Sequence, residues 1–295
     1  HNVSGMLMYM QREYRKSVRP NRLQGFSGRF TYDYKHKYLA EFNFGYNGTE
    51  RLAKGERFEF FPAMSVGWVP SGEDFWEPLQ NSINYFKLRA SYGVVGNDEM
   101  DEGAGHFLYV DNVTLSGGGF HTGYDGGKYY AGPGFNTLAV EDACWERVNK
   151  LNIGVDVELF NQLNITFDWF YDHRHKIFMK RGSWPVFLGY FGATPWSNIG
   201  EVDNRGVELS VNWHKEVIKD LYIDLRGNFT YNKNKYVYFD EPKYETVWTR
   251  KNGLPLSYMW GYVSDGYFTS EEEIANWPDQ TGLGSQVKPG DLKYR

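Results

Sequence analysis

Two groups of side chains have types and spacings that could support metal binding or hydrolysis. His173 and His175 stand two residues apart, so in an extended strand both imidazoles would project from the same face. No third ligand stands at a matching spacing, and a zinc site needs at least three protein ligands. Glu141, Asp142 and Glu146 could supply the carboxylate pair of a glycoside hydrolase, but nothing in their spacing sets the distance that such a pair requires. The sequence therefore predicts no catalytic residue, no metal site and no cofactor.

Aromatic side chains in two long loops form the one candidate binding site. The first loop, 96–142, is rich in Gly, Tyr and Asp, and the second, 174–200, combines Trp, Tyr, Phe and Pro. Flat aromatic faces stack on sugar rings, and neighbouring polar groups bind hydroxyls, which is the usual composition of a ligand site. The alternative is that these rings pack the loops together or against a partner protein. We predict ligand contacts for Trp184, Tyr190, Phe191, Trp196, Tyr129 and Tyr130, with Trp184 or Trp196 touching the ligand or the partner.

The segments that must hold these loops alternate between apolar and polar residues. Every second position is apolar in 151–159 and again in 163–171, with mainly Asn, Asp, Glu and Thr between them. A period of two over two arms, joined by a short turn that contains Asn161, predicts an antiparallel hairpin. One face of this hairpin is apolar and ends in Trp169 and Tyr171, whereas the other carries Asp156 and Asp168.

The same pattern recurs along most of the chain. Further alternating segments lie at 26–34, 38–46, 58–68, 86–92, 207–213 and 221–231. We therefore expect about eight strands of roughly ten residues, the length that crosses a bilayer when tilted. Residues 1–20 show no clear period, and Met6, Met8 and Met10 mark either the start of a strand or an extended lead-in. A short helical turn is expected near FWEPL (75–79), and Ser270 with Glu273 predicts a capping box for a short helix through Trp277.

The connections between the expected strands alternate in length. Short connections lie at 35–37, 160–162 and 214–220, and long ones at 47–56, 96–142 and 174–200. The intermediate link at 70–84 counts with the short ones. Short turns on one side and long loops on the other are the topology of outer-membrane β-barrels. A soluble sandwich rarely carries large apolar residues on one face and charges on the other, strand after strand.

Composition limits the class of protein. The mean hydropathy of −0.60 and the lack of an 18-residue apolar run exclude a transmembrane helix but not a membrane β-barrel. The net charge of −5 argues against a nucleic-acid partner, and the single cysteine, Cys144, excludes an intrachain disulfide. Because the chain starts at His1 and stops without a closing element, we expect it to be a fragment.

Six stretches match one family in order and spacing across nearly the whole chain. They are 28–53, 58–76, 86–98, 146–172, 198–213 and 261–295, and KLRASYGVVGN at 87–97 is the most specific of the motifs. On these stretches the chain resembles the SusC-like (SusC/RagA) TonB-dependent outer-membrane transporters of Bacteroidetes, in the later part of their barrel.

The resemblance implies an all-β fold, a transmembrane antiparallel β-barrel of about 22 strands plugged by an N-terminal domain, with long extracellular loops and short periplasmic turns. It implies import of oligosaccharides, or in some members peptides, across the Gram-negative outer membrane, and no enzyme activity. The implied partners are a SusD-like surface lipoprotein, the TonB–ExbBD complex and outer-membrane lipid. Residues 1–295 would be a partial barrel domain without the plug and the remaining strands, so we assign no energy-coupling residue to this chain.

Two other classes stay open. A plain porin or adhesin barrel would have the same strands and would lack a plug domain. A secreted all-β carbohydrate-binding or hydrolytic domain would be soluble without detergent. Near-neutral loops rich in aromatic residues favour a glycan ligand, and a peptide importer would look much the same.

Overall fold

The computed structural model describes residues 1–15, 20–100, 106–185, 187, 193–219, 221–284 and 286–294. The chain divides into two compact units, His1–Leu256 and Ser257–Arg295. Among the described residues, no helix has both the length and the apolar character needed to cross a membrane.

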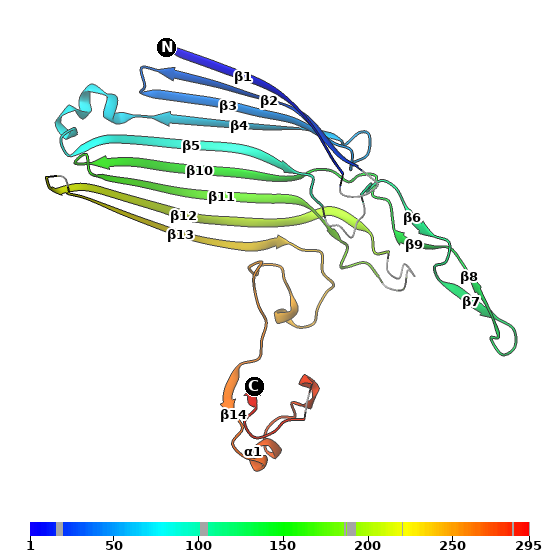
Figure 1. Ribbon diagram of the computed structural model, residues 1–295. Coiled ribbons are helices and arrows are strands. Elements are labelled where there is room, and N and C mark those ends of the chain that lie inside the picture. The colour runs from blue at the N-terminus through cyan, green and yellow to red at the C-terminus, as the bar shows by residue number, and fades with distance from the viewer. Residues whose placement is uncertain are drawn as a thin grey trace. The chain divides into compact units, whose positions relative to one another are not determined.

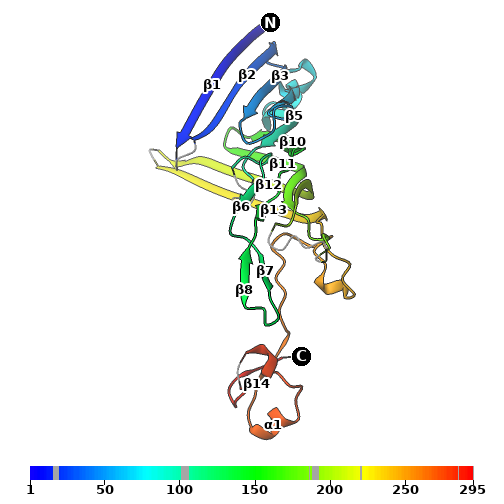
Figure 2. The same cartoon turned by 90° about the vertical axis from the view of Figure 1, so that its right-hand side faces the viewer.

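In the described part of the first unit, nine strands form one antiparallel sheet (Figure 1). Every strand pairs with its neighbours in chain order, and β5 pairs with β10 across a long loop. The strands are β1 (Asn2–Arg15), β2 (Pro20–Tyr34), β3 (Tyr38–Thr49), β4 (Phe58–Trp68), β5 (Ile83–Asn97), β10 (Glu146–Leu159), β11 (Leu163–Lys180), β12 (Trp196–Ile218) and β13 (Leu221–Tyr238). Figure 2 shows how far the strand direction turns from β1 to β13, as the twist of an antiparallel sheet requires.

The predicted hairpin turns at 35–37 and 160–162 are confirmed. Lys35 and His36 have φ values of 54° and 56°, and Phe160 and Asn161 both have 54°. Two successive left-handed residues define the type I′ geometry, whose twist matches that of the flanking strands. The link between β4 and β5 holds two 3₁₀ helices, η1 (Pro70–Gly72) and η2 (Asp74–Leu79), and η2 contains the expected FWEPL turn.

The strand count and several strand lengths differ from the sequence prediction. Nine described strands replace about eight, because β1 lies in the stretch without a clear period. Its two faces both carry apolar residues near the middle, Leu7 on one and Met6 and Met8 on the other, which hides the alternation. The expected loop 174–200 shortens to 181–195, and the expected turn 214–220 shortens to 219–220, because backbone pairing continues beyond the apolar stretches.

The apolar face of the sheet, which we call the outer face, is exposed. Tyr38, Phe42 and Tyr46 on β3 are 47%, 41% and 44% exposed. Monomeric soluble proteins rarely expose contiguous apolar areas of this kind. An outer face that meets lipid, with aromatic residues at the ends of the apolar run, is the arrangement of a membrane barrel.

The position of the apolar run shifts from strand to strand. Directly opposite residues share a face, so the register joins them into rows. The row of Tyr38 passes through Trp68, Leu88, Val155, Phe167 and Leu209, and that of Ala40 through Val66, Ala90, Ile153, Trp169 and Val207. The apolar run spans Tyr38 to Tyr46 on β3 and Val207 to Trp213 on β12. Relative to the rows, the run on β12 is displaced toward the short turns, by two rows at one end and by three at the other. A flat lipid slab imposes such a shift on tilted strands.

The height of the apolar band agrees with a bilayer. On the outer face of β12 the run is bounded by Arg205 and Lys215, ten residues apart. At about 3.4 Å per residue this is about 34 Å along the strand. For a tilt of about 40° the band is then about 26 Å high, close to the roughly 25 Å of outer-membrane barrels.

The second unit contains a two-stranded sheet, β14 (Ser264–Tyr267) and β15 (Leu292–Tyr294), with helix α1 (Glu271–Ala275) between them. The predicted N-cap is confirmed, since Ser270 accepts a hydrogen bond from the Glu273 amide, but the helix ends at Ala275 and not at Trp277. The Glu273 carboxylate accepts hydrogen bonds from Lys293 and from the amide and hydroxyl of Thr269. These bonds, led by that from Lys293, lower the pKa of Glu273 to about 2.

Candidate functional site

The long loop between β5 and β10 has a base against the sheet and a tip that projects from it. Two short two-stranded sheets form its distal part, β6 (Asn112–Thr114) with β9 (Gly134–Thr137) and β7 (Gly119–Thr122) with β8 (Lys128–Ala131). Figure 1 shows the β7–β8 hairpin as the part of the loop farthest from the sheet. Tyr129 and Tyr130 therefore lie at the tip, on β8.

The loop base is a buried apolar cluster, which we call the base cluster. It joins the loops 50–57, 98–111 and 138–145 to the ends of β4, β11 and β12. Its members are Leu52, Phe61, Met100, Leu108, Val140, Ala143, Trp145, Phe178 and Trp196. Trp145 is 3% exposed, and its indole packs edge-on against Phe61, with ring centroids 5.4 Å apart. These apolar residues sit inside segments that composition marks as polar loops.

Hydrogen bonds hold the base cluster in register. The Trp145 indole N–H donates to the Arg57 carbonyl oxygen at 3.0 Å. The Arg57 guanidinium donates to the Leu52 carbonyl oxygen at 3.0 Å and to the Tyr109 hydroxyl at 3.2 Å. The Val140 amide donates to the Leu108 carbonyl oxygen at 2.7 Å. Backbone carbonyl groups of one loop are thus satisfied by donors from another, which connects the loop bases to one another.

The sheet opens between β4 and β5 to admit this cluster. Their pairing stops at Ala63 and Gly93, although both strands continue toward the loops. The Phe61 ring occupies the space where a side chain at Gly96 would stand, so that position requires glycine. Beyond it, Arg147 of β10 forms an ion pair with Glu59 of β4.

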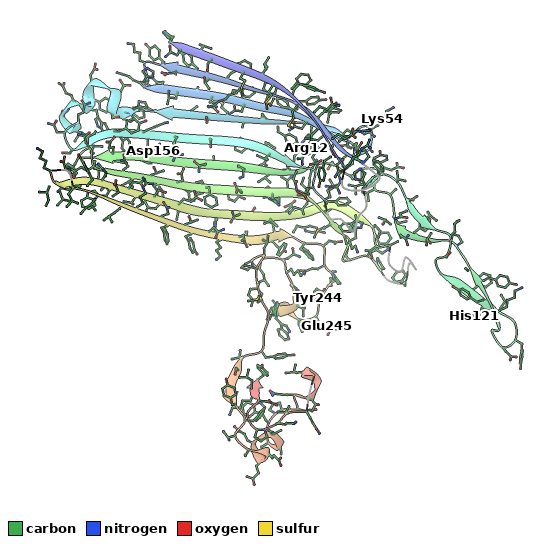
Figure 3. All side chains as sticks on the ribbon, viewed as in Figure 1. Arg12, Lys54, His121, Asp156, Tyr244 and Glu245 are labelled. Atoms are coloured by element: carbon green, nitrogen blue, oxygen red, sulfur yellow. The ribbon has the colours of Figure 1, made fainter. Side chains whose placement is uncertain are left out.

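The tip carries a set of stacked and exposed rings. Tyr130 stacks on Phe120 with centroids 5.8 Å apart, and Tyr129 lies 5.0 Å from His121, which Figure 3 labels. The Lys128 ammonium lies 4.8 Å from the centre of the Tyr130 ring. Tyr129 and Tyr130 are 52% and 42% exposed, so part of each side chain is accessible to a ligand or a partner protein.

Trp196 is buried, and its side chain packs against neighbouring residues. It is the first residue of β12, it is 7% exposed, and it stacks on Phe178 with centroids 5.4 Å apart and planes 7° apart. Lys180 covers the ring at 5.3 Å. The structure therefore favours, for Trp196, the alternative that loop aromatics pack against one another.

Trp184 is half-buried and lies in a segment held by a buried carboxylate. Asp240 is 4% exposed and accepts hydrogen bonds from the Arg181 guanidinium at 2.8 Å and from the Ser183 hydroxyl at 2.7 Å. Burial raises the pKa of Asp240, but the bonds from Arg181 and Ser183 outweigh it and hold this pKa below its ordinary value. The segment of Trp184 is thereby tied to the end of β13.

The four predicted ligand-binding residues that the structure describes are not all brought together. Tyr129 and Tyr130 share the tip, whereas Trp184 and Trp196 lie near the ends of β11 and β12, apart from the tip in both Figure 1 and Figure 2. Tyr190 and Phe191 lie outside the described residues, and their prediction stays open.

The groups considered for metal binding and hydrolysis have other contacts. His173 and His175 stack with centroids 5.5 Å apart, and His173 Nδ1 lies 2.8 Å from Asp203. Glu146 is 6% exposed and accepts hydrogen bonds from the Asn97 amide group and the Phe178 backbone N–H. Within the described ranges, no three His, Cys, Asp or Glu side chains are grouped so as to hold a metal ion.

The inner face of the sheet carries a charge cluster that the sequence analysis did not identify. Arg89 of β5 donates to Asp156 of β10 at 3.0 Å and to Asp168 of β11 at 2.7 Å. Gly154 leaves the room for this, because a Cβ there would meet both Arg89 and Asp168. Figure 3 places Asp156 on the sheet, far from the tip. Alternation shows that all three residues share the polar face, but only the register shows that they meet.

Known proteins share this sequence pattern and fold. The model of the family described as TonB dependent receptor-like, beta-barrel matches residues 15–285. The TonB-dependent receptor P39 of Formosa agariphila is 30% identical over 263 residues, which cover 87% of this chain and 24% of that protein. The TonB-dependent receptor SusC of Bacteroides thetaiotaomicron is 28% identical over 217 residues, covering 73% of this chain and 21% of SusC.

Among solved structures, the RagAB peptide importer in its open-open state has the same fold over most of the chain. The TM-score is 0.67 at 21% identity, and the match covers 94% of this chain and 29% of that one. This chain spans about a quarter of the length of the curated relatives that it matches.

Proposed function

Because this chain belongs to the TonB-dependent receptor-like β-barrel family, we propose that residues 1–295 form part of the barrel wall of an outer-membrane importer. The imported ligand is an oligosaccharide or a peptide. TonB–ExbBD supplies the energy through a plug domain, and a SusD-like surface lipoprotein covers the extracellular side. In this role the chain binds and guides a ligand and performs no catalytic step.

The observation that carries this proposal is the contrast between the two faces of one sheet. The outer face has an apolar band about 26 Å high. The inner face has the Arg89–Asp156–Asp168 cluster and a hollow of about 370 Å³ whose lining includes Glu41 and Lys87. A polar inner wall suits the passage of a hydrated, hydrogen-bonding ligand, and an apolar outer wall suits lipid.

The chemistry of the loop tip is compatible with two ligand classes. Exposed tyrosine faces next to Lys128 and His121 can stack on sugar rings or pack on peptide side chains. The resemblance to SusC-like transporters implies a glycan, which the aromatic loops also favour, and the RagAB structure is that of a peptide importer. We propose a glycan and keep a peptide as the alternative.

Exposure divides the predicted contact residues. Tyr129 and Tyr130 are exposed at the tip, and Trp184 is half-buried, so we propose these three as contacts to the ligand or the lipoprotein. Trp196 is buried against Phe178, and we propose a packing role for it.

The first experiment replaces Tyr129 and Tyr130 together with Ala in the full-length transporter. Uptake of the ligand and co-purification of the surface lipoprotein are measured, with Tyr244→Ala, an exposed tyrosine after β13, as the matched control. The double variant should reduce one or both readouts while the control leaves them unchanged. Wild-type values for both readouts in the double variant would refute the contact role of the tip.

Membrane fractionation tests the class of protein separately. Recovery in the outer membrane, with uptake that stops when TonB is removed, supports the importer. Uptake that continues without TonB would favour the porin. Recovery in the soluble fraction without detergent would favour a secreted carbohydrate-binding domain.

A further inference from the structure

The outer face changes abruptly from apolar to basic at the loop side of strands β11 to β13. The last apolar row there consists of Trp169, Val207 and Tyr231. The next row consists of Tyr171, Arg205 and Lys233, and the one after it of His173, Asp203 and Lys235. The register is continuous through these rows, so all of these side chains share the face that carries the apolar band.

The cations of these two rows are incompletely neutralised. Lys235 Nζ lies 3.7 Å from Asp203, and the same carboxylate contacts His173 at 2.8 Å. In the part of the chain that the structure describes, Arg205 and Lys233 form no salt bridge, and both are exposed. Three permanent cations therefore face one carboxylate at the edge of the apolar band. We call Arg205, Lys233 and Lys235 the basic triad.

Other edges of the band lack such an excess. Beyond the apolar run of β1 and β2, Glu13 pairs with both Arg15 and Arg22, and Arg22 also approaches Glu50. At the turn side of β12, Lys215 faces Ile223 across the ladder and stands without a second cation in its row. The excess of positive charge at the loop side of β12 and β13 is thus absent from these two other edges of the band.

We propose that the basic triad binds the phosphate of a lipid headgroup in the leaflet on the side of the long loops. Neighbouring strands lie about 4.8 Å apart and successive residues of one face about 7 Å, so the three cations can converge on one phosphate or on two adjacent ones. Long basic side chains at the edge of an apolar band keep their stems in hydrocarbon and their charges at the headgroups. This proposal depends on the part of the proposed function that places the barrel in a membrane, and it does not depend on which ligand the transporter imports.

The test uses the full-length transporter in nanodiscs of phosphatidylcholine, with or without diphosphorylated lipid A. Wild type should gain thermal stability when lipid A is present and should retain bound lipid A through purification. The triple variant R205Q/K233Q/K235Q should lose most of this gain, since each removed charge weakens attachment to an anionic headgroup about fivefold. The control K215Q removes one lysine from the opposite edge of the same band and should behave as wild type.

Three outcomes would overturn the proposal. The first is an equal gain in Tm for wild type and triple variant. The second is a gain of the same size from inorganic phosphate in pure phosphatidylcholine, which would indicate a free-anion site. The third concerns a triple variant that fails to insert into the membrane. R205Q and K233Q are then tested as single variants, and full retention of lipid A by both would refute binding of a lipid phosphate by the triad.

Discussion

The base and the tip of the loop between β5 and β10 use similar residues for opposite purposes. At the base, Trp145 is 3% exposed and is packed by Phe61 and hydrogen-bonded to the Arg57 carbonyl oxygen. At the tip, Tyr129 and Tyr130 keep about half of their surface open, although they too stack on neighbouring rings. Ring stacking alone therefore does not distinguish packing from binding.

What separates the two regions is the number of segments that meet there. The base cluster draws residues from three loops and the ends of three strands, so each ring is covered from several sides. The tip is one two-stranded hairpin, which has no further layer to bury a second face. Rings at the base are thus tied to stability, and rings at the tip are available to a partner.

The largest expected effect is that of Trp145→Ala. Removing a buried Trp leaves a cavity and takes away one of the two hydrogen bonds to the Arg57 carbonyl oxygen, which keeps that from the Thr49 amide. The substitution should destabilise the base cluster by about 3–5 kcal/mol. Amide hydrogen exchange of segments 50–57 and 138–145 in the full-length protein measures this local opening. Tyr124→Ala at the fully exposed end of the tip is the control and should leave exchange unchanged. Unchanged exchange in the Trp145 variant would contradict the inference that rings at the base contribute more to stability than rings at the tip.

A smaller effect is expected for Asp240→Asn, which weakens the clamp on the Trp184 segment. Loss of a buried charged acceptor should cost about 1–3 kcal/mol at neutral pH. Because the folded pKa of Asp240 lies below its unfolded value, the stabilisation is present above the unfolded pKa, near 3.9, and is lost as pH falls through the folded pKa. As the pH is lowered, residues 181–184 should therefore lose more protection from amide hydrogen exchange in the wild type than in the variant. The same pH dependence in both would contradict the clamp.

The smallest effect on stability is expected at the tip. Tyr129→Ala with Tyr130→Ala should change the stability of the base cluster by less than about 0.5 kcal/mol, as for other exposed positions. Exchange in segments 50–57 and 138–145 is again the measurement, taken on the same samples as the uptake assay. Loss of uptake together with an opened base would mean that the tip acts through packing and not through contact.

Most of the sheet is readable from the sequence. Alternation identified eight strands of the large sheet, β2 to β5 and β10 to β13, together with the turns at Lys35–His36 and Phe160–Asn161 and the face that meets lipid. It did not identify the four short strands β6 to β9, which lie in the predicted loop 96–142. It left β1 undecided between a strand and an extended lead-in, because Met6 and Met8 make both faces apolar, and it placed Trp196 in a loop. In β12, pairing with β11 extends the strand past the point where the apolar pattern stops, because hydrogen bonding of the backbone does not depend on side-chain polarity.

The candidate site was less accessible to sequence reasoning. The signal for the base cluster was weak, a few apolar residues such as Leu52, Leu108 and Trp145 inside Gly- and Asp-rich stretches. Nothing in the spacing of Arg89, Asp156 and Asp168 showed that they meet, because their separation along the chain is unrelated to their positions across three strands. The same holds for Arg205, Lys233 and Lys235.

The sequence by itself determined the class of structure, since a side-chain period of two and the contrast between faces are local properties of an extended chain. The tertiary structure decided which aromatic rings are buried, which charges converge and where the apolar band ends on each strand. These depend on register and on contacts between segments far apart in the sequence, where a shift of one residue would move every side chain to the other face.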